Sequence, residues 1–189
     1  MREEIQSLTI AEDNTVPDTL GVVSKDVSQN QDGTVMLWYA PKQITIGSTT
    51  KTMYDMWIGG ENGVLQTETN ASGMFAYLTN IEKLDLSKLD TSYITNISKM
   101  FYMSSGLKTI DLSKFDTSNV TNMSGMFQNC SKLKIVYVSG LWDTSKVTSS
   151  FDMFMNCTSL VCAVQFDSTK TDISMANYTT GYLTYKSNN

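Results

Sequence analysis

The dipeptide Met-Phe recurs along this chain at nearly constant intervals, and this repetition limits the possible folds more than any other feature. From Met74 to Met100 and from Met100 to Met126 the interval is 26 residues, and from Met126 to Met153 it is 27. A period between 20 and 50 residues is typical of proteins that stack one structural unit upon another. The sequence therefore predicts a repeated array.

Each repeat contains an apolar segment that predicts a short strand. The segments are IEKLDLS (81–87), LKTIDLS (107–113) and LKIVYVS (133–139). They follow the L-x-x-L-x-L pattern of leucine-rich repeats, in which the leucine positions point inward. We expect these strands to lie side by side in one parallel sheet, roughly 4.8 Å apart.

A polar segment that begins with Asp-Thr-Ser follows each strand and predicts a helix. In FDTSNVTNMSGMFQNC (115–130), Val120, Met123, Met126 and Phe127 recur every three or four residues, the period of a helix with one buried face. Asp116 would begin this helix as its N-cap. Asn129, and Asn156 in the next repeat, would end it, because asparagine tolerates the left-handed conformation.

These patterns predict an α/β solenoid, a right-handed leucine-rich-repeat coil with one parallel sheet and helices on the opposite face. Residues 1–50 would form a β-rich N-terminal cap, in which strands at 34–40 and 43–48 are joined around Pro41 and Lys42. Residues 51–73 would be a linker or a degenerate first coil, residues 74–168 the solenoid and residues 169–189 a C-terminal cap or tail, with a last hairpin through Thr180-Gly181. The segment 160–166 has Ala163 and Gln165 where leucines are expected, as in a terminal coil.

The segment LKTIDLSKFDTSNVTNMSGMFQNC (107–130), repeated one period away on either side, resembles the BspA-like leucine-rich-repeat proteins of bacterial surfaces, a repeat also abundant in mycoplasmas. The segment 26–38, followed by ITIGS (44–48), looks like the lead-in to such repeats. The resemblance covers roughly residues 22–166. It implies an extracellular or cell-surface adhesion or interaction role, without known catalytic residues.

Composition argues against several functional classes. The net charge of −5 and the lack of a basic stripe argue against nucleic-acid binding. No apolar run is long enough to span a membrane. The chain contains no histidine, which excludes Ser-His-Asp and Cys-His catalysis and histidine-based zinc sites. We expect no enzymatic activity, no catalytic residue, no metal and no cofactor.

The exposed face of the predicted sheet is the candidate site. Residues that alternate with the inward leucines point outward, and solenoid sheet faces are common binding surfaces. These residues are Lys83, Asp85, Ser87, Thr109, Asp111, Ser113, Ile135, Tyr137 and Ser139. The expected partner is a protein or glycan on a host or neighbouring cell, and a merely solvated face is the alternative.

Two further sets of residues leave alternatives open. Asp90, Asp116 and Asp143 would form a column that either caps helices or binds calcium, with capping favoured. Cys130 and Cys157 occupy the same position in adjacent repeats and are either two buried thiols, the favoured reading, or a disulfide.

A second functional class also fits the sequence. The N-terminal residues 1–14 are acidic and lack the apolar segment of a secretion signal. A phage tail or capsid-decoration protein needs no export signal, since particles leave the cell by lysis. The alternative is therefore a structural protein on a virion surface, in contact with other virion proteins.

Overall fold

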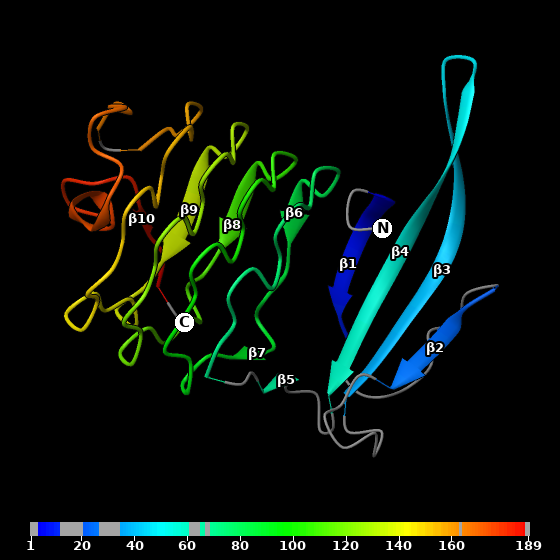
Figure 1. Ribbon diagram of the computed structural model, residues 1–189, viewed down its shortest axis with the longest axis horizontal. Coiled ribbons are helices and arrows are strands. Elements are labelled where there is room, and N and C mark those ends of the chain that lie inside the picture. Colours follow the sequence, from blue (N-terminus) through cyan, green and yellow to red (C-terminus); the bar gives the residue numbers. More distant parts are fainter. Residues whose placement is uncertain are drawn as a thin grey trace.

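Strands and turns form nearly all of the structure, which is a computed structural model describing residues 4–11, 21–26, 35–60, 65–66, 69–162 and 164–187. A mixed four-stranded sheet near the N-terminus stands beside a row of stacked repeats that carries a parallel four-stranded sheet (Figure 1). The described residues contain no α-helix. A short 3-10 helix, η3 (Ile173–Met175), precedes the last strand.

The N-terminal sheet has the order β1-β4-β3-β2, formed by β1 (Ile5–Ile10), β2 (Val23–Asp26), β3 (Val35–Ile46) and β4 (Thr49–Gly60). β1 runs parallel to β4, and the other pairs are antiparallel. Residues 51–60, assigned to a linker or degenerate coil from the sequence, lie in β4.

The predicted hairpin turn at Pro41 and Lys42 is wrong. β3 runs straight through both residues, and the chain turns after Ile46, where Gly47 has a φ of 63°. β2 pairs with β3 only as far as Tyr39. Pro41 lies beyond the end of β2, where the outer edge of β3 has no neighbouring strand that would require a backbone N–H donor. Residues 12–20 and 27–34, parts of the expected cap, lie outside the described residues.

The repeats pair through the expected strands. The parallel sheet has the order β10-β9-β8-β6, with β6 (Lys83–Leu84), β8 (Thr109–Asp111), β9 (Ile135–Val138) and β10 (Thr184–Tyr185). Lys83 pairs with Thr109 and Thr109 with Ile135, so the register advances by one 26-residue repeat at each step. β5 (Leu65–Gln66) and β7 (Leu89–Asp90) form a separate parallel pair.

The expected α/β solenoid with helices opposite the sheet is wrong, because the segments predicted to be helical are runs of turns. Their alternate N–H groups donate to the next repeat instead of four residues back: Phe101 donates to the carbonyl oxygen of Met126 and Phe127 to that of Met153, both at 2.9 Å. Two positions per repeat have positive φ, which an α-helix cannot accommodate. They are Gly73 and Tyr77, Lys99 and Met103, Gly125 and Asn129, and Asp152 and Asn156.

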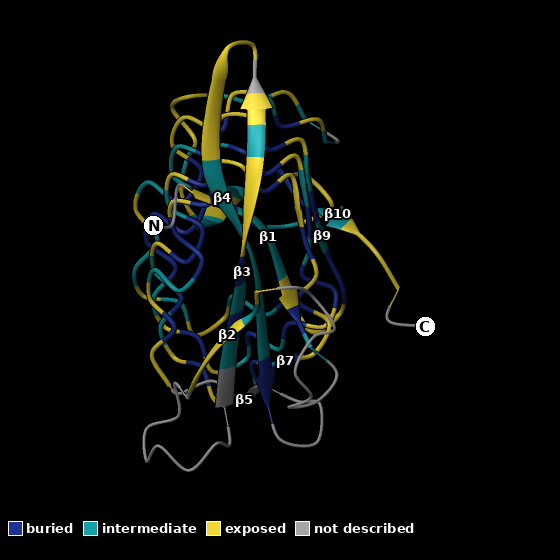
Figure 2. Ribbon diagram, turned by 90° about the vertical axis from the view of Figure 1, so that its right-hand side faces the viewer, coloured by how far each residue is buried: buried dark blue, intermediate teal, exposed yellow. Residues whose placement is uncertain are grey.

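The turn segments nevertheless bury the residues that the periodicity selected. Val120, Met123, Met126 and Phe127 are buried. The phenylalanines stack in register, with ring centroids 5.8 Å apart for Phe75 and Phe101, 5.5 Å for Phe101 and Phe127, and 5.6 Å for Phe127 and Phe154. Stacked rings at this separation add to the hydrophobic effect of burial. Figure 2 shows buried segments running through the repeats inside exposed outer turns.

Both ends of this core are covered by other parts of the chain. Ile5 and Ile10 of β1 belong to the same continuous core as the repeats. At the other end Tyr182 packs edge-on against Phe154, with ring centroids 5.4 Å apart. The expected hairpin through Thr180-Gly181 does not form; the tail joins the sheet as β10, parallel to β9.

The last repeat departs from the others as expected. Among the described residues of its strand segment, Val161 and Gln165 form an isolated antiparallel bridge. Ala163, which the sequence places at a leucine position, lies outside the described residues.

Candidate functional site

The structure brings most of the predicted sheet-face residues together on β6, β8 and β9. Lys83, Asp85 and Ser87 are exposed, and Thr109, Asp111, Ile135 and Tyr137 are partly exposed. The parallel register aligns Lys83, Thr109 and Ile135 in one row and Asp111 and Tyr137 in the next.

Two of the predicted residues do not face the solvent. Ser113 and Ser139 are buried, and the Ser139 hydroxyl donates to the carbonyl oxygen of Ser113 at 2.7 Å. The same hydroxyl oxygen accepts a hydrogen bond from the N–H of Leu141. Both residues therefore hold neighbouring repeats together, since a buried hydroxyl needs such partners.

Lys186, which the sequence analysis missed, completes this face. Following β10, its ammonium group forms an ion pair with Asp111. Its Nζ atom lies 5.8 Å from the centroid of the Tyr137 ring, within the range of a cation–π interaction. The alternation of Leu183, Thr184 and Tyr185 fits a strand, but it does not distinguish half of a hairpin from a strand that joins this sheet.

The ion pair changes the acidity of both groups. Partial burial by itself would raise the pKa of the Asp111 carboxyl, but hydrogen bonds from Lys186 and Ser113 outweigh burial, and the pKa is lowered. The hydrogen bond to Asp111 raises the pKa of Lys186. Both groups are consequently charged at neutral pH.

A shallow groove of about 400 Å³ follows these side chains across the sheet. Its lining includes Lys83, Asp85, Thr109, Asp111 and Tyr137. A smaller hollow of about 150 Å³ lies beside it, between Asp85, Asp111 and Lys186. Together they offer carboxylates, ammonium groups, hydroxyls and an aromatic ring, which suit hydrogen bonding and stacking with a ligand.

The aspartates of the Asp-Thr-Ser segments close turns, since there is no helix for them to cap. The side-chain oxygens of Asp90, Asp116 and Asp143 each accept the N–H two residues ahead, at 3.0, 2.9 and 2.8 Å. The backbone hydrogen bond from Ser145 is the main cause of the lowered pKa of Asp143. No group of three His, Cys, Asp or Glu residues with a geometry for a metal ion occurs among the described residues.

Cys130 and Cys157 are unpaired buried thiols, which confirms the favoured reading. The Cys130 thiol donates to the carbonyl oxygen of Phe101 at 3.0 Å, and the Cys157 thiol to that of Phe127 at 2.9 Å. The Ser104 hydroxyl makes the equivalent bond to Phe75. Burial raises the pKa of Cys130 to about 12 and also raises that of Cys157.

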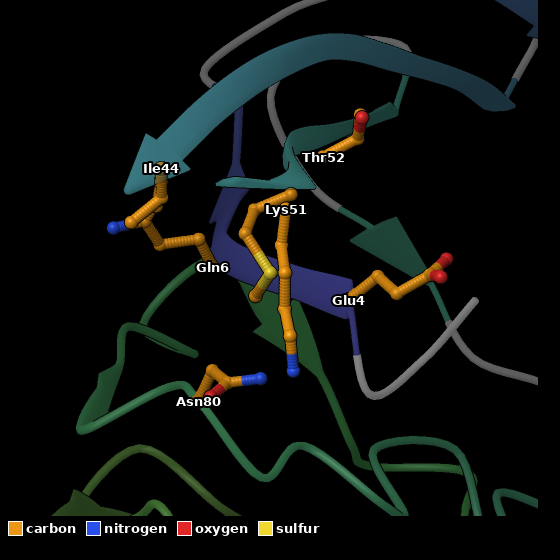
Figure 3. Close-up of a pocket in the computed structure, with 7 residues that line it drawn as sticks. Glu4, Gln6, Ile44, Lys51, Thr52 and Asn80 are labelled. Atoms are coloured by element: carbon orange, nitrogen blue, oxygen red, sulfur yellow. The ribbon is translucent and has the colours of Figure 1, made fainter. Parts of the chain in front are cut away.

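A larger hollow of about 630 Å³ lies where the N-terminal sheet meets the first repeat. Glu4, Gln6, Ile44, Lys51, Thr52, Met53 and Asn80 line it, and Figure 3 shows Lys51 extending toward Asn80.

Comparison with known protein families identifies the repeats. A family model described as "Mycoplasma protein of unknown function, DUF285" matches residues 69–188, well over half of the chain. The chain belongs to the DUF285 family. The match covers the stacked repeats and the β10 tail, which contain the sheet face, and leaves β1 to β5 outside.

The DUF285 match confirms the mycoplasma-type repeat in the expected resemblance, whereas no BspA-like family is matched. The function of DUF285 is unknown, and a surface-associated module without enzymatic activity is compatible with it. No curated protein and no solved structure matches the chain. Within the part of the chain that the structure describes, no helix could cross a membrane.

Proposed function

We propose that this protein is a non-enzymatic recognition module that binds a protein or glycan through the exposed face of β6, β8 and β9, outside the cell or at its surface. One observation carries the proposal: polar and aromatic side chains from three successive repeats line one shallow groove. Residues such as Asp85 and Lys83 are exposed there without a role in the core.

An ion pair within the protein supports the proposal that this face binds polar groups. Lys186 extends over the Tyr137 ring and pairs with Asp111, so an ammonium group of the protein itself already binds the carboxylate of this repeat. In the preceding repeat one oxygen of Asp85 accepts the N–H of Ser87. Its other oxygen can accept a hydrogen bond from a ligand hydroxyl, amide or ammonium group.

A binding test can distinguish specific binding at this face from nonspecific adsorption of the protein. Wild-type protein and a Lys83→Ala/Asp85→Asn variant would be applied to glycan arrays and to arrays of extracellular-matrix proteins. Asp85→Asn keeps the side-chain oxygen that accepts the N–H of Ser87, so the turn is retained. We expect a signal for the wild type that the double variant loses and that Lys25→Ala, a charge change on β2, retains.

Signals that are equal for wild type and double variant would refute the sheet-face proposal. A structural role on a virion is the second candidate, and the same variant addresses it. In that case the face would bind another particle protein, and the double variant would be left out of assembled particles while glycans and matrix proteins gave no signal.

A further inference from the structure

The turn segments between the strands carry an unexpected set of side chains at their strained positions. Each repeat has two residues with positive φ. The first of these positions holds Gly73, Lys99, Gly125 and Asp152 in successive repeats, and the second holds Tyr77, Met103, Asn129 and Asn156. Glycine adopts this conformation freely and asparagine readily, whereas long side chains are strained there.

The second repeat has neither glycine nor asparagine at its two positions of positive φ. Both of its left-handed positions hold long side chains, Lys99 and Met103, each with a φ of 55°. The third repeat makes the same turns with Gly125 and Asn129. The backbone geometry therefore does not require lysine or methionine, and backbone strain kept at chosen positions is a known sign of a functional site.

The same side chains are exposed and gather in one place. Tyr77 and Met103 are each 39% exposed although they are large apolar residues. Tyr102, which precedes Met103 in the chain, accepts the N–H of Tyr77 at 2.8 Å, and its ring centroid lies 5.5 Å from that of Tyr77 at an interplanar angle of 80°. The Nζ atom of Lys99 lies 5.7 Å from the Tyr102 ring. We call Tyr77, Lys99, Tyr102 and Met103 the Tyr102 patch.

The charge around the patch indicates the sign of its partner. Residues 69–80, 95–107 and 121–131, the turn segments of three repeats, contain no aspartate or glutamate, and Lys99 is their one charged residue. This holds in a chain whose net charge is −5. A lone ammonium group above an aromatic ring, without an acidic neighbour in these segments, favours a carboxylate from outside.

We propose that the Tyr102 patch is a second docking surface, which binds an acidic segment of a partner protein. A carboxylate of the partner pairs with Lys99, and an apolar side chain next to it packs against Tyr77 and Met103. Tyrosine and methionine are enriched in protein–protein interfaces, and methionine adapts to irregular apolar surfaces, which favours a polypeptide over a glycan. This surface is made of different residues from the sheet face and does not depend on the function proposed for it.

The repeats themselves supply variants that remove the patch without harming the fold. Lys99→Gly, Met103→Asn and Tyr77→Asn install residues found at the equivalent positions of other repeats. If the three side chains serve binding, the triple variant should unfold at the same temperature as the wild type or a higher one, because backbone strain is relieved.

A display library of random peptides, selected on immobilised wild-type protein, supplies the binding probe. We expect selected peptides rich in Asp and Glu beside an apolar residue, which bind the triple variant at least about tenfold more weakly. Lys25→Ala, which removes a lysine from β2, should keep wild-type affinity, and replacing Glu by Gln in the peptide should weaken binding to the wild type alone.

Three outcomes would overturn the proposal. The first is a lowered unfolding temperature of the triple variant, which assigns these side chains to stability. The second is a set of selected peptides without acidic enrichment or without sensitivity to the triple variant. The third is that the triple substitution weakens the binding of a sulfated or uronic-acid oligosaccharide but not the binding of any peptide. That result would assign the patch to glycans.

Discussion

The stacked repeats and the N-terminal sheet satisfy their backbone in different ways. In the repeats, backbone hydrogen bonds join neighbouring units, as from Phe101 to Met126, and the phenylalanine rings stack in register. In the N-terminal sheet the long β3–β4 hairpin pairs with itself and extends beyond both β1 and β2 (Figure 1). Repetition thus buries one continuous core, whereas much of the hairpin stays exposed on its way to the tip.

Thiol labelling gives the largest expected contrast within the repeats. Cys130 and Cys157 are fully buried, so they should react only when the repeats open, protected by up to the free energy of global unfolding, about 5–15 kcal/mol. Cys162 is partly exposed and should react first. Mass spectrometry of native protein during alkylation measures this, and rapid labelling of all three cysteines would contradict a stack that opens as one unit.

Truncation of a stacked ring tests the contribution of the core. Phe127→Ala removes a fully buried ring between Phe101 and Phe154 and should lower the free energy of unfolding by about 3–5 kcal/mol, measured by urea titration. Val23→Ala, on the edge strand β2 where Val23 is 46% exposed, is the comparison and should change the free energy of unfolding by less than about 0.5 kcal/mol. Similar losses at both positions would remove the contrast between the two regions.

A glycine inside the repeats tests how closely neighbouring units approach. A methyl group at Gly106 would clash with the backbone carbonyl oxygen of Thr79 in the preceding repeat. Gly106→Ala should therefore destabilise the protein by about 1–3 kcal/mol in thermal or urea unfolding. Gly140→Ala meets no atom within 4 Å and serves as the matched control, so a loss at Gly140 as large as that at Gly106 would argue against this cause.

The smallest expected effect concerns the ion pair on the sheet face. Because the pKa of Asp111 is lowered in the folded protein, its contribution to stability is present above the pKa of the unfolded chain and disappears as the pH falls through the folded value. Lys186→Ala should raise the Asp111 pKa, which a carbon NMR titration of the carboxyl measures. An unchanged titration would show that Ser113 alone sets the acidity.

The sequence predicted the repeat, its strands and its buried positions, but not the conformation between the strands. A spacing of three or four residues between buried side chains fits a helix, and successive turns that bond to the next repeat reproduce the same spacing. Gly125 and Asn129, four residues apart, were the sign of two left-handed residues. That sign is incomplete in the second repeat, where Lys99 and Met103 take those positions.

The candidate sites show the same limit. The alternation rule placed Asp85, Asp111 and Tyr137 outside correctly. It placed Ser113 and Ser139 outside wrongly, because these two serines are buried and bond to each other between neighbouring repeats. Lys186 could not be assigned to the site because its distance from Asp111 in the chain is 75 residues. The Tyr102 patch depends on positive φ values at Lys99 and Met103, whose residue types do not by themselves indicate a left-handed conformation.

By itself the sequence determined the 26-residue period, the inward apolar positions and the lack of histidine chemistry, since these follow from residue types and their spacing. Only the tertiary structure decided that the intervening segments are turns and not helices. The physical reason is that every repeat offers its neighbour a matching row of carbonyl groups, so backbone hydrogen bonds form between repeats instead of within a helix.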